Sequence, residues 1–220
     1  MDPSQISYNV RIFGNLVENG TTDIGNTETD GNPNLHDWYI YNNIFYNIGS
    51  SFFTGLPNTW IFNNIFMLQG TGGGAVALMF YTDNAGTQSG GNTGYDYDSA
   101  GSKVINNAFI ANSSDIGVGG KGGTLSTVTI TNNYFASNTS YTAERSPTGT
   151  AYVNGGNPKF TNPTGRDFHI SSGSALIGKG ANLSSVFTID KDLNERASTG
   201  AWDIGPYQYQ SASITRPLHR

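Results

Sequence analysis

A ten-residue line that occurs more than once restricts the fold of this chain more than any other feature. Residues 39–48 read YIYNNIFYNI, and residues 60–69 read WIFNNIFMLQ. Alignment on the second asparagine gives five related segments, whose aligned residues are Asn15, Asn43, Asn64, Asn107 and Asn133. Self-similarity at intervals of a few tens of residues is typical of a solenoid built from stacked repeats.

The residues around each asparagine explain why the line repeats. Three residues earlier the chain has Ile12, Ile40, Ile61, Val104 and Ile130, and two residues later it has Val17, Phe45, Phe66, Phe109 and Phe135. Because strand residues alternate between two faces, apolar positions on both sides of a bend can fill one core. Asparagine accepts the backbone geometry of a bend, and stacked amides can hydrogen-bond from coil to coil. The repeat therefore predicts an all-β solenoid with an asparagine ladder.

Composition agrees with this fold and excludes several partners. The 220 residues suit one domain, and strand-forming Tyr, Phe, Thr, Val and Ile dominate the apolar runs. The net charge of −5 leaves no basic stripe, so we expect neither a nucleic acid nor an anionic membrane as a partner. The chain has no cysteine, no apolar run long enough to span a membrane, and no signal peptide at its N-terminus.

The repeat resembles that of the right-handed parallel β-helix proteins of the pectate-lyase-like superfamily. In that pattern a first strand, PB1, is followed by two strands, PB2 and PB3, around the asparagine corner. The five aligned segments match the PB2–PB3 part. The candidates for PB1 are TDIGN (22–26), SSFFTG (50–55), AVALMFYTD (75–83), DIGVGGKG (115–122) and TAYVNG (150–155).

The C-terminal third resembles the cap of secreted bacterial β-helix proteins. The matching segments are RDFHISSGSALIGKGAN (166–182), DKDLNERAS (190–198) and AWDIGPYQYQ (201–210). The resemblance implies a β-helix domain over residues 1–210, with coils at about 8–160, a capping region at about 161–210 and a tail at 211–220. It also implies an extracellular or cell-surface location.

Two further expectations concern the ends of the solenoid. We interpret Asp190, Arg196 and Asp203 as a structural network that closes the last coil, since solenoids need capped ends. The sequence shows no recognisable cap before Ile6. An uncapped first coil predicts either self-association through that coil or that the chain is a piece of a longer β-helix.

A loop beside PB1 is the first part of the predicted site. In enzymes that this chain resembles, a polysaccharide lies in a groove over the outer face of PB1. The longest interval between repeats holds the segment 81–103, which begins at the end of a PB1 candidate, and long loops are often functional. Its carboxylates are hard oxygen ligands of the kind that calcium takes, and its tyrosines offer flat faces to sugar rings. The predicted calcium ligands are Asp83, Asp96 and Asp98, and the predicted substrate-binding residues are Tyr81, Tyr95, Tyr97 and, at the edge of the groove, His36.

Two basic residues complete the predicted site. Lys121 lies in the next PB1 candidate and could abstract the proton α to a uronate carboxylate, which the calcium would neutralise. Arg145, in the following coil, could bind a second acidic sugar. The predicted catalytic residues are thus Lys121, Arg145 and Asp83, and the predicted function is polysaccharide lyase chemistry on an acidic polysaccharide.

Alternatives remain open at this point. A glycoside hydrolase would need two or three carboxylates in the groove, and Asp23, Asp83 and Asp115 lie near PB1 candidates. A glycan-binding module without catalysis, or a structural surface solenoid, would need no such residues, because one fold carries many functions.

Overall fold

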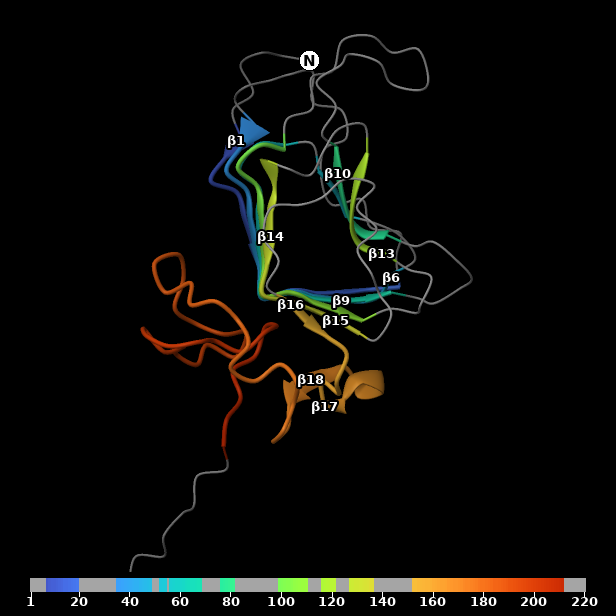
Figure 1. The fold of residues 1–220 in the computed structure, drawn as a ribbon, viewed down its shortest axis with the longest axis vertical. Helices are drawn as coiled ribbons and strands as arrows, with labels where there is room; N and C mark the ends of the chain where they lie inside the picture. The colour runs from blue at the N-terminus through green and yellow to red at the C-terminus, as the bar shows by residue number, and fades with distance from the viewer. Residues whose placement is uncertain are drawn as a thin grey trace, which may run out of the picture.

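The chain folds into a parallel β-helix, as the repeat predicts. The computed structural model describes residues 7–19, 35–48, 52–54, 56–68, 76–81, 99–110, 116–121, 127–136 and 152–211. Three parallel sheets form the sides of the coil, and Figure 1 looks along the stack so that the strands of each sheet lie behind one another. In the described ranges no helix is long and apolar enough to cross a membrane.

Two of the sheets meet at the asparagine corner. The strands before the corner, sheet PB2, are β2 (Arg11–Phe13), β5 (Tyr39–Tyr41), β8 (Trp60–Phe62), β11 (Lys103–Ile105) and β14 (Thr129–Thr131). The strands after the corner belong to sheet PB3. They are β3 (Leu16–Glu18), β6 (Ile44–Ile48), β9 (Ile65–Leu68), β12 (Ala108–Ile110) and β15 (Asn133–Phe135). The register aligns the repeats as the sequence does, with Ile40 opposite Ile61 and Phe45 opposite Phe66.

The third sheet confirms three of the predicted PB1 strands. Sheet PB1 consists of β7 (Phe52–Thr54), β10 (Val76–Tyr81) and β13 (Ile116–Lys121). The candidate at 22–26 lies outside the described residues. The candidate at 150–155 is wrong, because β16 (Tyr152–Asn154) pairs with β15 and is the last strand of PB3. A short pair, β1 (Ser7–Tyr8) with β4 (Leu35–His36), precedes PB2.

The interior of the coil is apolar and filled by the predicted residues. Eight of the ten are buried in one cluster, and Ile12 and Val17 of the first coil pack against it. Phe45, Phe66, Phe109 and Phe135 stack with ring centroids 4.8, 5.2 and 5.1 Å apart and nearly parallel planes. Because strands of neighbouring coils lie about 4.8 Å apart, in-register phenylalanines stack face to face without adjustment of the backbone.

The ladder runs through the second asparagine of each pair. The Asn15, Asn43, Asn64 and Asn107 amides each donate to the side-chain oxygen of the next rung, over 2.9 to 3.1 Å. Each backbone amide donates to that same oxygen. The second amide hydrogen is also used, since Asn64 Nδ2 donates to the carbonyl of Ile40 at 2.9 Å. The rungs from Asn43 to Asn133 are fully buried and satisfied along the axis.

The first asparagine of each pair has a different task. Asn42, Asn63, Asn106 and Asn132 have φ between +52° and +59°, a left-handed conformation that asparagine tolerates better than most residues. Gly14 has φ +71° at the same place in the first coil. The corner is thus turned by one asparagine and hydrogen-bonded internally by its neighbour.

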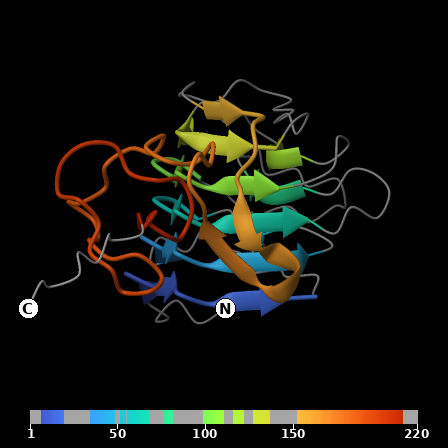
Figure 2. The same ribbon diagram turned by 90° about the horizontal axis from the view of Figure 1, so that it is seen from below.

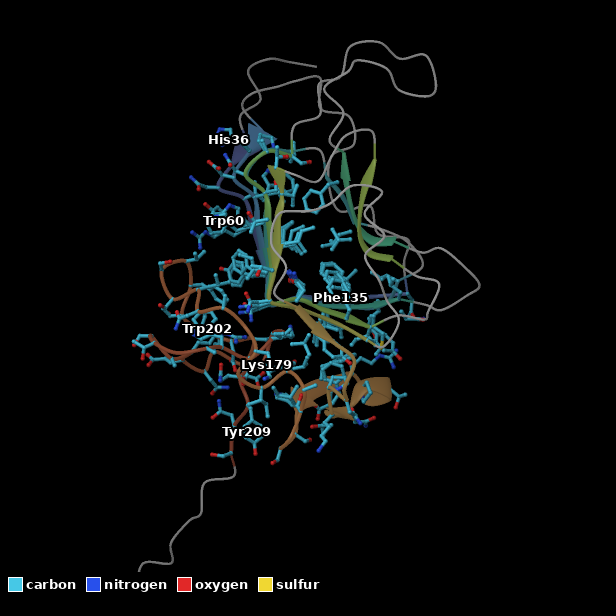
Figure 3. The ribbon with its side chains drawn as sticks, in the orientation of Figure 1. His36, Trp60, Phe135, Lys179, Trp202 and Tyr209 are labelled. Atoms are coloured by element: carbon cyan, nitrogen blue, oxygen red, sulfur yellow. The ribbon has the colours of Figure 1, made fainter. Side chains whose placement is uncertain are left out.

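The outer faces of PB2 and PB3 are also apolar and are covered by the C-terminal segment 157–210. Outside PB3, Ile44, Ile65, Ala108 and Tyr134 pack with residues of this segment that include Phe168 and Ile204. Outside PB2, Tyr41, Phe62 and Ile105 pack with Leu183, Phe187 and Trp202. Figure 2 shows the orange and red segment across the side of the stack, where Trp202 and Tyr209 are labelled in Figure 3.

This segment lies along the side of the solenoid and not over its last coil, where the sequence had suggested closure. The outward asparagines hold it: Asn42 donates to the carbonyl of Ile189, Asn63 to those of Asp203 and Gly205, and Asn132 to that of Lys179. At the first coil Lys191 donates to the carbonyl of Gly14. The hairpin of β17 (Phe160–Asn162) and β18 (Asp167–Ile170) covers PB3, where Arg166 pairs with Glu18.

The middle of the ladder should matter more for stability than its end. We expect Asn64→Ala to lower the free energy of unfolding by about 1–3 kcal/mol, because the variant leaves buried partners without hydrogen bonds. Asn15→Ala removes an exposed terminal rung and should cost about 1 kcal/mol or less. Chemical denaturation measures the free energy of unfolding of both variants. Equal losses would contradict the view that the buried rungs contribute more to stability than the exposed one.

Candidate functional site

The backbone of PB1 brings two of the predicted site residues together. Strands β10 and β13 pair in parallel, and the last residues of the two strands, Tyr81 and Lys121, are register partners. Leu78 and Phe80 on β10 and Val118 on β13 are buried in the coil interior. We predicted that Lys121 lies one coil away from the PB1 strand that precedes the long loop. The backbone register of β10 and β13 confirms this prediction.

The other predicted residues of this site lie outside the described ranges. They are Asp83, Tyr95, Asp96, Tyr97, Asp98 and Arg145. The calcium site therefore stays a prediction. In the part of the chain that the structure describes, no three His, Asp or Glu side chains come together as a metal site.

His36 is the one predicted substrate-binding residue whose side chain is described. It lies on β4, and its Nδ1 is 2.7 Å from Oδ2 of the adjacent Asp37. Asp37 has φ +59°, so the chain turns there before entering PB2. Figure 3 places His36 at the start of PB2, above Trp60. Both side chains are about one third exposed, so the pair remains accessible to a ligand.

The predicted structural network of the cap is buried, and most of its hydrogen bonds are made with backbone groups. Asp190 accepts from the amides of Asp192, Asn194 and Gln208. Asp203 accepts from the amides of Gly178 and Tyr209, at 2.7 and 2.6 Å. These carboxylates fix the path of the C-terminal segment, and their burial closes them to a substrate.

Arg196 is the cation at the centre of this network. Its guanidinium donates to the carbonyls of Gly205 and Asp203, and it lies over the rings of Trp202 and Phe187, with 5.2 and 5.8 Å to the centroids. Burial lowers the pKa of Arg196 to about 10, against the opposing effect of Asp190 and Asp203. It therefore remains charged at neutral pH. Its role is structural, as expected, but the network fixes a segment on the side of the solenoid and does not close the last coil.

A second cluster of titratable groups, which sequence reasoning did not find, lies on the C-terminal segment. His169 Nδ1 is 2.6 Å from Oδ1 of Asp167, and its Nε2 is 2.6 Å from Oδ2 of Asp192. The imidazole also packs on the ring of Tyr207, with centroids 4.0 Å apart. The sequence shows a histidine in DFHI and two carboxylates in DKD, but over twenty residues separate them, and the sequence does not indicate that they are in contact.

The electrostatics of this cluster follow from the two carboxylates. Burial lowers the pKa of His169, but the hydrogen bonds to Asp192 and Asp167 outweigh it, so the pKa is raised above its ordinary value. The hydrogen bond from His169 lowers the pKa of Asp167. Burial, with the nearby Asp192, Asp167 and Asp190, raises the pKa of Tyr207 to about 12. His169 thus links β18 to the loop at 190–194 through its two ring nitrogens.

Comparison with protein-family models, with curated proteins and with solved structures found no match for this chain. The assignment of the fold therefore rests on the sheets, the register and the ladder of the molecule itself.

The His169 link should stabilise the fold below neutral pH. Because the folded-state pKa is raised, its contribution is full below the ordinary value and is lost as pH rises through the folded pKa. We expect the melting temperature of His169→Gln to fall below wild type at about pH 5.5 and to approach it at about pH 8.5. Asp192→Asn should likewise lower the melting temperature at acidic pH, because it removes one of the two carboxylates bound to His169. A difference independent of pH would show that His169 acts only through packing.

Proposed function

We propose that this chain is a carbohydrate-active member of the pectate-lyase-like β-helix group, acting on acidic polysaccharide along the outer side of PB1. The observation that supports the proposal is the register of Tyr81 with Lys121 at the ends of two adjacent PB1 strands. The backbone positions of a tyrosine and a lysine then lie about one strand spacing, roughly 5 Å, apart along the axis. A chain of sugars laid along the axis meets both.

The proposed reaction is β-elimination at a uronate. The Lys121 amine takes the proton from the carbon α to the carboxylate, and the electron pair left there forms the new carbon–carbon double bond. The glycosidic oxygen on the β carbon leaves with the pair of its broken bond and is protonated. Arg145 binds the carboxylate of a neighbouring sugar. Calcium held by Asp83, Asp96 and Asp98 would neutralise the reacting carboxylate and so acidify the α proton.

Two features of the molecule favour this placement. Among the described residues, the two buried carboxylates, Asp190 and Asp203, are bonded to backbone amides and are closed to a substrate. Asp23, Asp83 and Asp115, which a glycoside hydrolase would use, lie outside the described residues. The outer faces of PB2 and PB3 beside the corner are covered by the C-terminal segment. We therefore place the polymer along PB1.

The reaction product tests the proposal. A panel of acidic polysaccharides should yield an unsaturated sugar that absorbs in the near ultraviolet. Lys121→Ala should lower the rate by about a hundredfold or more while leaving the melting temperature unchanged, since a general base contributes on this scale. Lys179→Ala, an exposed lysine on the C-terminal segment, is the matched control and should retain full activity.

Other outcomes distinguish the remaining readings. Reducing ends without ultraviolet absorbance would replace the lyase by a hydrolase. Binding of the polysaccharide without any product would leave a glycan-binding module. Activity that survives both Lys121→Ala and chelation of calcium would place the reaction elsewhere.

A further inference from the structure

The first coil presents an edge that the rest of the described chain does not cover. Strands β2 and β3 are the outermost strands of PB2 and PB3, and each pairs on one side only, with β5 and β6. In Figure 2 these blue strands form one end of the stack. A free strand edge is a template for pairing with another strand.

The free hydrogen-bonding groups of this edge can be assigned. The carbonyls of Val10 and Asn15 accept from coil two, and the amides of Gly14 and Asn19 donate to it. Groups of successive strand residues alternate sides, so the amides and carbonyls that point away belong to alternate residues. These residues are Arg11, Phe13, Leu16 and Glu18. The carbonyl of Phe13 already accepts from Nδ2 of Asn15 at 3.0 Å and has a second lone pair for a partner strand.

Exposed apolar side chains gather at the same end. Among the described residues, the large hydrophobic side chains that are exposed are Phe13 at 49%, Leu16 at 43% and Leu193 at 72%. Lys191 joins the loop that carries Leu193 to Gly14 of the first coil. Leu193 also has φ +68°, a strained conformation for leucine. An apolar cluster beside a free edge indicates an interaction surface.

The two arms of the edge are complementary to each other. Gly14 and Asn15 turn the corner between β2 and β3, so a two-fold axis along the bisector of that corner lays β2 of one copy against β3 of another. Because β2 runs toward the corner and β3 away from it, the two strands meet antiparallel. With corner above corner, Phe13 faces Leu16, Ile12 faces Val17 and Arg11 faces Glu18.

We propose that this edge is a self-association surface, through which two copies of the chain join their first coils around a two-fold axis. The residues with outward-pointing backbone groups are those that fall opposite each other, as hydrogen-bonded pairs of an antiparallel ladder require. The apolar interior continues from one copy to the other through Ile12 and Val17. Arg11 meets a carboxylate, and such a self-complementary patch is what a two-fold dimer needs.

The existing contacts of the two charged residues are compatible with this pairing. Glu18 pairs with Arg166 on the outer side of PB3, and a carboxylate has room for a second donor. Arg11 lies 5.2 Å from the ring centroid of Tyr39, and no hydrogen bond joins its guanidinium to another described residue, which leaves room for a further partner. The proposal is independent of any activity at PB1.

Sedimentation velocity over a range of concentrations tests the dimer, with charge reversals as the decisive variants. Arg11→Glu and Glu18→Arg should each weaken dimerisation by about tenfold or more, since each reversal acts twice per dimer. The double variant restores opposite charges across the interface and should regain most of the affinity. Lys103→Glu is the matched control. It stands in the same row as Arg11 and lies over Trp60, but three strands from the edge, and it should leave the dimer intact.

Several results would overturn the proposal. One is a folded wild type that stays monomeric at every concentration. Others are single charge reversals that leave the affinity of the dimer unchanged, or a double variant that dimerises no more tightly than the single variants. Slow exchange of the Phe13 and Leu16 amides in a dilute monomeric sample would show that a segment of the same chain already covers the edge.

Discussion

The buried amide groups at the asparagine corner impose the constraint on which the rest of the structure depends. A buried amide without partners destabilises a fold strongly, so each rung must find a carbonyl or amide at the spacing of neighbouring strands. The ladder from Asn43 to Asn107 meets this condition, with two side-chain donors and one backbone donor used per rung. The coils must therefore stack in register, which in turn stacks the phenylalanines of the core.

The pairing of two asparagines divides the corner between the inside and the outside. The inner residue binds the next coil, while the outer one turns the chain and offers its amide to the surface. There the outer residues bind carbonyls of the C-terminal segment, from Asn42 to Asn132. Beside the corner, PB2 and PB3 are consequently covered on both faces from the second coil onward, as is usual for parallel sheets. One repeated dipeptide thus supports both the coil and its outer layer.

The sequence was most informative where a residue repeats its task in every coil. The inward positions and the ladder follow from fixed offsets to Asn43 and its equivalents, and the structure confirms them. Three PB1 strands were expected from the resemblance to β-helix proteins, and they are confirmed as well. The lateral path of residues 157–210 was missed, although the apolar pair Tyr41 and Ile44 already marked the outer face. A pattern shows that a face is covered, but the identity of its cover depends on contacts that are distant in sequence.

The same reason explains why the site was less predictable than the fold. Tyr81 and Lys121 could be placed because both end strands of known register. Asp167, His169 and Asp192 come together only because the hairpin and the loop at 190–194 both lie on the solenoid. The wrong prediction of a PB1 strand at 150–155 has the same origin. The segment forms β16, which pairs with β15 in PB3, and the sequence does not show this partner.

The central claim is that the coils and the C-terminal segment form one folding unit joined through the outer asparagines. Native-state hydrogen exchange measures this directly. The amides of Asn64 and Asn107, which donate within the ladder, and those of Gly178 and Tyr209, which donate to Asp203, are the reporters. We predict that all four exchange with the same free energy, that of global unfolding. If the amides of Gly178 and Tyr209 exchange at a much lower free energy while those of the ladder stay protected, the coils and the C-terminal segment are not one folding unit.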